Sequence, residues 1–188
     1  MLIKSITLNN FRQFKGKQSL VFSTDTSKNV TVLLGDNTYG KTTILQAFNW
    51  CLYGVADFPK DSNPDFLLNL EVANEQAGIQ QKCEVYVELI LKHKDTEYIV
   101  LRKQVYIDRA YGNWNALNNQ ITVSYKENGI TKQVREGEER TIINGILPQS
   151  LSGYFFFDTE RVAYISTRKD LSEAVRGLLG LAAVGNVF

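Results

Sequence analysis

Residues 35–42 have the types and spacing of a loop that binds phosphate groups. They follow the pattern of glycine, any four residues, glycine, lysine, and serine or threonine. The two glycines let the backbone approach phosphate oxygens closely, so that successive N–H groups donate to them. Lys41 places a positive charge on the β and γ phosphates, and the Thr42 hydroxyl is positioned to ligate magnesium. The pattern therefore predicts binding of ATP together with Mg²⁺.

The predicted nucleotide contacts extend over the whole loop and into the residues that follow it. A helix that begins at the loop would add its positive end, and Thr43 would add a hydroxyl beside the α-phosphate. The candidate nucleotide-binding residues of this segment are Gly35, Asp36, Asn37, Thr38, Tyr39, Gly40, Lys41, Thr42 and Thr43, with Thr42 also a candidate metal ligand. The alternative is a degenerate loop that keeps its shape without binding nucleotide.

The segments on either side of this loop have the patterns of a strand and a helix. Residues 30–34 form a short apolar run rich in β-branched side chains, which predicts a strand buried on both faces. Between residues 41 and 53 the apolar side chains recur at helical spacing, and Gly54 stands where a left-handed cap would end the helix. Strand, loop and helix in this order are the arrangement that phosphate binding requires.

Further elements are predicted from periodicity and turn residues. Residues 57–65, with two prolines, mark a loop that leaves the nucleotide-binding core. The remaining predicted strands are residues 2–8, 19–22, 83–91, 97–107, 120–125, 130–134 and 154–157, and the remaining predicted helices are residues 66–74, 140–147 and 170–181. The antiparallel strands of the middle third form a separate β lobe in this interpretation.

The composition is that of an ordinary globular protein, with 44% hydrophobic and 22% charged residues. A net charge of +1 neither requires nor excludes nucleic acid. There is no apolar stretch long enough to span a membrane and no signal-peptide pattern, so we expect a cytoplasmic protein without a membrane partner.

Cys51 and Cys83 stand among apolar residues and are expected to be buried, reduced thiols. His93 is expected in a solvated turn.

The amino-terminal segment Leu8-Asn9-Asn10-Phe11-Arg12-Gln13-Phe14, upstream of the loop, resembles the head domains of SMC-like ABC ATPases, the group that includes the RecF and RecN proteins. Those heads open with a similar Asn-Phe-Arg-x-Phe turn that lies beside the nucleotide. The resemblance nominates Arg12 for a phosphate or adenine contact. The alternative is a solvated arginine in a turn.

Residues 147–161 contain the run Phe155-Phe156-Phe157-Asp158-Thr159-Glu160, which looks like the Phe-Phe-Phe-Asp-Gly-Glu stretch of DndD-type coiled-coil ATPases of DNA phosphorothioation and phage-defence systems. The resemblance places Asp158 at the Q-loop position, where it would contact nucleotide and ligate magnesium. The alternative is that Asp158 caps the following helix. Thr38 and Thr159 stand where the related motifs carry glycine.

The fold class expected from these observations is α/β, a P-loop NTPase of ABC/SMC-head type, with a mixed sheet around the P-loop helix and an antiparallel β lobe. The expected division is a P-loop core over residues 1–56, the β lobe over 57–135, a return to the core with a Q-loop-like strand over 136–169, and a helix over 170–188 that leads toward a coiled coil.

We find no Walker B pair and no convincing signature motif in this sequence, so we expect no catalytic residue within it. The resemblance implies that a C-terminal lobe of the same head supplies Walker B, and that a second head of a homodimer supplies the signature in trans. The expected role is therefore that of an ATP-binding half of a head that dimerises on ATP. Self-contained kinases or nucleotide hydrolases, and a non-catalytic module with a relict loop, remain the alternatives.

DNA is an expected partner through the resemblance, and accessory defence or nuclease subunits are further ones. Lys92, Lys94, Arg102 and Lys103 lie near the ends of the middle strands and are candidates for a basic rim that contacts DNA phosphates. The alternative is an ordinary solvated surface.

Overall fold

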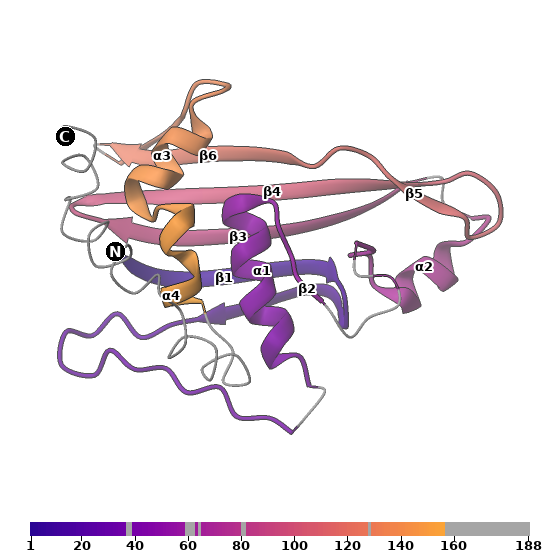
Figure 1. The fold of residues 1–188 in the computed structure, drawn as a ribbon, viewed down its shortest axis with the longest axis horizontal. Coiled ribbons are helices and arrows are strands. Elements are labelled where there is room, and N and C mark those ends of the chain that lie inside the picture. Colours follow the sequence, from indigo (N-terminus) through magenta and orange to yellow (C-terminus); the bar gives the residue numbers. More distant parts are fainter. Residues whose placement is uncertain (37–38, 59–62, 64, 80–81, 128, 157–188) are drawn as a thin grey trace, which may run out of the picture.

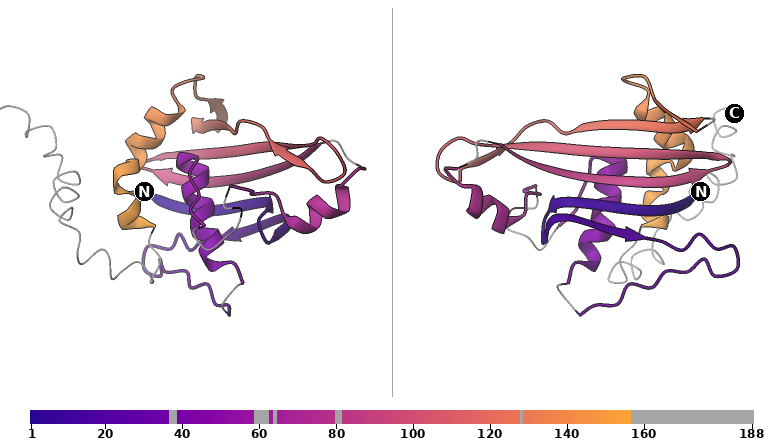
Figure 2. Two further views of the ribbon diagram at one scale, coloured as in Figure 1. Left: turned by 45° about the vertical axis from the view of Figure 1, so that its right-hand side comes forward. Right: turned by 180° about the vertical axis from the view of Figure 1, so that it is seen from behind.

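A seven-stranded antiparallel sheet with helices on one face forms the body of the protein (Figure 1). The computed structural model describes residues 1–36, 39–58, 63, 65–79, 82–127 and 129–156. Seen from behind, the strands lie in front and the helices α1 and α3 lie on the far side, so these helices cover the same face (Figure 2). The α/β class predicted from the sequence is confirmed.

The strands follow one another in the spatial order β2-β1-β3-β4-β6-β7, with β5 paired to the far end of β4. Their bounds are β1 Leu2–Phe11, β2 Phe14–Val21, β3 Lys82–His93, β4 Thr96–Asp108, β5 Trp114–Ala116, β6 Gln120–Glu127 and β7 Ile130–Gln133. The helices are α1 Lys41–Tyr53, α2 Leu70–Gln76, α3 Glu139–Ile146, the 3-10 turn η1 Gln149–Leu151, and α4 Ser152–Phe155.

Strand β3 shows why the sheet has one helix-covered face. Its burial alternates along the strand, and the buried set is Cys83, Val85, Val87, Leu89 and Leu91, as the apolar and polar alternation predicts. β3 pairs with β1 on one side and with β4 on the other. The amino-terminal strand and the middle strands therefore share one sheet. The division of the chain into segments stays a prediction.

Helix α1 packs on the centre of this sheet. Ala47, Trp50 and Cys51 are at most 2% exposed, and the Trp50 ring lies 5.5 Å from that of Phe11 in β1. The helix ends at Gly54, whose φ of 77° is the left-handed cap that the sequence predicts. Cys51 is a free buried thiol, as predicted, and burial raises its pKa to about 12. Cys83 is likewise free and buried.

Arg102 lies on the helix-covered face of β4, only 5% exposed, beneath the last turn of α1. Its Nε donates to the Cys51 carbonyl at 3.0 Å and its Nη2 to the Leu52 carbonyl at 3.3 Å. These are two of the carbonyl groups that a helix end leaves without partners. The prediction that Arg102 belongs to a basic rim is therefore wrong, because the side chain is buried beneath α1 and does not reach the surface.

The other members of the expected rim do not gather around it. Lys103 follows Arg102 on the strand, so it faces the opposite side of the sheet, where it lies 3.5 Å from Glu84. Lys92 and Lys94 lie at the β3–β4 turn, and Lys92 is 3.9 Å from Asp95. His93, the last residue of β3, is partly exposed, while its Nδ1 is buried without a hydrogen-bond partner in the described residues.

Residues 30–34, predicted as a buried strand, are extended but form no strand, and Val30, Val32 and Leu34 are 76%, 70% and 93% exposed. A strand of that kind needs hydrogen-bonded neighbours, and the described residues supply none to it. All strand pairings in the described part of the chain are antiparallel, so the mixed sheet that we expected around α1 is not seen there. Figure 1 shows the segment as a long excursion beyond β2.

The aromatic run that begins at Tyr154, predicted as a strand, lies in helix α4 as far as Phe155. A short apolar run fits either structure by periodicity alone. Here Phe156 stacks on Phe48 of α1, with ring centroids 5.4 Å apart, so the run packs on a helix and not on a sheet. The predicted helix 66–74 begins later, at Leu70, because Asn69 accepts the Val72 N–H and caps it.

None of the helices in the described ranges has the length and hydropathy needed to cross a membrane.

The anchoring of α1 by Arg102 leads to a stability prediction. Arg102→Met would leave the Cys51 and Leu52 carbonyls without donors in a buried site, so we expect it to lower the free energy of unfolding by about 2–4 kcal/mol. Lys103→Met on the same strand removes only a surface ion pair and should cost less than about 1 kcal/mol. Urea unfolding monitored by tryptophan fluorescence measures both. Equal losses would contradict the anchoring role.

Candidate functional site

The loop meets helix α1 at Gly40, which adopts a left-handed conformation with a φ of 94°. Gly40 is buried against the β1–β2 turn, and a Cβ at this position would lie 2.7 Å from both Gln13 Nε2 and the Phe14 ring. The left-handed backbone favours glycine here, and a Cβ would force the Gln13 and Phe14 side chains to move. The second glycine of the sequence pattern is the residue that lets the loop pass close to the turn.

Lys41 begins α1 and folds back over the loop. Its Nζ donates to the carbonyl oxygens of Gly35 and of Asp36, the latter at 2.9 Å. The ammonium group therefore lies against the loop backbone, where the pattern predicts that it meets phosphate. Both acceptors are neutral carbonyls on exposed residues, so the lysine can exchange them for charged oxygens without burying its charge.

The first turn of α1 presents the positive end of the helix. No side chain caps it, and no acidic residue lies in that turn. Its N–H groups therefore keep the partial positive charge that favours an anion. Thr42 is exposed on this turn, as a magnesium ligand would have to be.

Thr43 has a different role from the predicted one in this structure. Its side chain is buried, and its Oγ1 donates to Gln13 Oε1 at 2.8 Å. The hydroxyl thus joins the helix to the β1–β2 turn. A phosphate contact by Thr43 stays a prediction and would require this bond to break. Gln13 was not among our candidate residues, and the only signal for it was its place in the Asn-Phe-Arg-x-Phe turn.

Arg12 lies at the tip of the same turn, with a left-handed φ of 53°. Its Nη1 donates to the Phe66 carbonyl at 2.6 Å, and its guanidinium carbon lies 4.3 Å from the centroid of the Phe58 ring. Burial lowers the pKa of Arg12. Arg12 is therefore half-buried and held by contacts within the chain. A contact of Arg12 with nucleotide stays a prediction.

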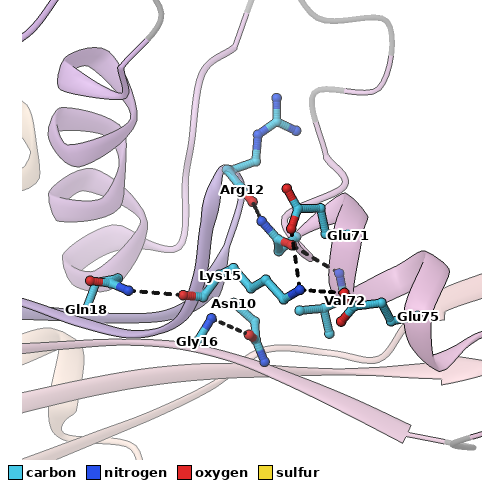
Figure 3. Close-up of polar contacts among 9 residues, drawn as sticks. Asn10, Arg12, Lys15, Gly16, Gln18, Glu71, Val72 and Glu75 are labelled. Atoms are coloured by element: carbon cyan, nitrogen blue, oxygen red, sulfur yellow. Dashed lines mark hydrogen bonds and ion pairs between the residues drawn. The ribbon is translucent and has the colours of Figure 1, made fainter.

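Helix α2 holds this turn in place (Figure 3). The Asn69 side chain donates to the Arg12 carbonyl at 2.6 Å, and Lys15 lies 2.5 Å from Glu75 and 3.4 Å from Glu71. Figure 3 shows the Arg12 guanidinium directed away from this acidic pair. The turn is therefore fixed from one side by α2 and from the other by α1.

The structure brings together Gly35, Asp36, Tyr39, Gly40, Lys41, Thr42 and Thr43 with the turn that carries Arg12. Asn37, Thr38 and Asp158 lie outside the described residues. Among the described residues no group of His, Cys, Asp or Glu is arranged to hold a metal ion.

Comparison with known proteins assigns the chain to a family. The model of a family described as an AAA domain matches residues 5–181, which includes the loop, the β1–β2 turn and the sheet. A search of curated proteins finds no match.

The close approach at Gly40 gives a prediction with a matched control. Gly40→Ala should lower the free energy of unfolding by about 2–4 kcal/mol, because a left-handed φ and overpacking against Phe14 both cost stability. Gly137→Ala shares a φ of 91° but meets nothing within 4 Å, so it should lose only about 1–2 kcal/mol. Urea unfolding of both variants tests this. A loss no greater for Gly40→Ala would mean that the turn does not press on the loop.

Proposed function

The chain belongs to the AAA domain family, and from this premise we propose that residues 35–43 bind ATP with Mg²⁺. The observation that carries the proposal is Lys41, whose ammonium group lies on the carbonyls of Gly35 and Asp36 at the uncapped start of α1. A γ-phosphate offers charged oxygens in place of these neutral ones, and charge-assisted bonds are the stronger. The helix end adds its own attraction for the phosphates.

We further propose that the nucleotide is shared with other protein surfaces, as in an SMC-like head. The exposed apolar segment 30–34 supports this, because Val30, Val32 and Leu34 lack the strand neighbours that such a sequence calls for. A C-terminal lobe of the same head would supply those strands together with Walker B. A second head would supply the signature motif in trans. The head would then dimerise on ATP, and hydrolysis would release it.

Asp158 is proposed as the second protein ligand of magnesium, beside Thr42, and Arg12 as a contact to the nucleotide. DNA is proposed as the substrate on which the ATPase acts, and DNA modification or defence as its setting. The described basic residues give this less support than the sequence suggested, since Arg102 anchors α1. The DNA-binding surface is then expected in the assembled head.

Removal of the loop lysine tests nucleotide binding. Lys41→Ala should weaken ATP–Mg²⁺ binding about 10- to 100-fold, because charge-assisted bonds to the phosphates are lost. Lys28→Ala, an exposed lysine whose side chain is free of the loop, should bind normally. Isothermal titration calorimetry of both variants measures the effect. An unchanged affinity for Lys41→Ala would show that the loop is a relict.

The role of Thr42 has a separate readout in the magnesium dependence. Thr42→Ala should lose most of the increase in ATP affinity that Mg²⁺ produces, while Thr42→Ser keeps the hydroxyl and should retain it. The measurement is a titration with ATP in Mg²⁺ and again in EDTA. If Mg²⁺ helps Thr42→Ala as much as the unaltered protein, Thr42 is not a ligand.

A further inference from the structure

A second site lies at the other end of α1 from the loop. There the last turn of α1, strand β4 and helix α3 enclose a cavity of about 220 Å³. It is smaller than the roughly 300–1,000 Å³ of pockets that hold a whole cofactor or drug-sized ligand, so it suits a single small group. Its walls include Leu52, Tyr53, Arg102, Arg140, Ile143 and Asn144.

The cavity holds positive charge without a counter-ion. Arg102 and Arg140 both line it, and no Asp or Glu does so among the described residues. Arg102 donates to the Cys51 and Leu52 carbonyls and to Asn119 Oδ1 at 2.5 Å, none of which carries a formal charge. Arg140 is exposed and makes no hydrogen bond or ion pair within the described part of the chain. Two guanidinium groups therefore share one cavity with no carboxylate.

The electrostatic environment of Arg102 also favours a bound anion in this cavity. Burial lowers its pKa, and the positive charge of Arg140 lowers it further, so the two groups are near enough to repel. If Arg102 only anchored α1, the repulsion from a second arginine beside it would destabilise the fold with no compensating interaction. An anion between them would remove that repulsion.

The remaining polar groups are suited to an oxyanion. The Asn144 side chain accepts the Gln149 N–H at 3.0 Å through its Oδ1, which leaves its amide Nδ2 as a donor at the cavity. Gln149 lines the cavity as well, and its side-chain amide is another donor. Guanidinium forks match phosphate oxygens in geometry, and two of them balance the two charges of a phosphate or phosphomonoester dianion.

We propose that this cavity binds a phosphate dianion between Arg102 and Arg140, at the end of α1 opposite the nucleotide loop. The group is either free inorganic phosphate or the terminal 5′-phosphate of an oligonucleotide, since both present the same dianion. The site is independent of ATP binding at residues 35–43.

The test uses the whole chain with the variant Lys41→Ala, so that the nucleotide loop does not contribute. Inorganic phosphate is titrated calorimetrically at pH 8, with ionic strength held constant by chloride. Phosphate should bind to Lys41→Ala, and adding Arg140→Gln should weaken that binding about tenfold or more. Arg135→Gln is the control, because Arg135 is exposed and lies outside the cavity lining. Unfolding midpoints confirm that each variant is folded.

A second arm distinguishes the two sources. The same variants are titrated with an oligonucleotide that carries a 5′-phosphate and with its 5′-hydroxyl counterpart. Binding of the phosphorylated oligonucleotide alone, lost in Arg140→Gln, supports a nucleic-acid end as the ligand. Binding of inorganic phosphate without either oligonucleotide supports the free anion. Absence of phosphate binding in Lys41→Ala, or binding unchanged by Arg140→Gln, overturns the proposal.

Discussion

The hydrogen bonds from the buried Arg102 guanidinium to the last carbonyls of α1 fix the helix on the sheet. The rest of the site depends on this contact, because α1 is a rigid rod of 13 residues, about 20 Å long, whose other end begins the phosphate-binding loop. A helix free to slide on the β3–β4 surface would carry Lys41 and Thr42 with it. Burying the Arg102 guanidinium removes it from water, which is unfavourable. Hydrogen bonds from its N–H groups to carbonyl and amide oxygens offset that desolvation penalty.

The amino-terminal end of α1 is held by a different device. The β1–β2 turn presses Gln13 and Phe14 against Gly40, and the Thr43 hydroxyl bonds to Gln13. The turn is itself held by Asn69 and by the Lys15 ion pairs with α2. Strand β1 thus links the central sheet directly to the loop. This explains in physical terms why residues so far apart as Gln13 and Thr43 belong to one site.

Sequence patterns predicted the elements whose periodicity is set by one packed face. The helix from Lys41 to Gly54 and the strand β3 were found because their apolar residues repeat at 3.6 and at 2 residues. Residues 30–34 and the run at Tyr154 do not form the strands that the sequence predicts. A short apolar run indicates a segment suited to packing, but it indicates neither the type of element nor the segments that would cover it. The sequence does not predict the roles of Gln13 and Arg102, because each acts through contacts between distant segments, which no local spacing records.

The central claim is that ATP–Mg²⁺ is bound by the loop and the start of α1, beside the β1–β2 turn. Hydrogen–deuterium exchange of the backbone amides, with and without ATP–Mg²⁺, tests this most directly, because the phosphates would occupy those N–H groups. The account predicts slower amide exchange over residues 35–43 and in the β1–β2 turn, with little change in the exchange rates of β6 and β7. Unchanged exchange at residues 35–43 under saturating nucleotide, or protection only elsewhere in the chain, would contradict it.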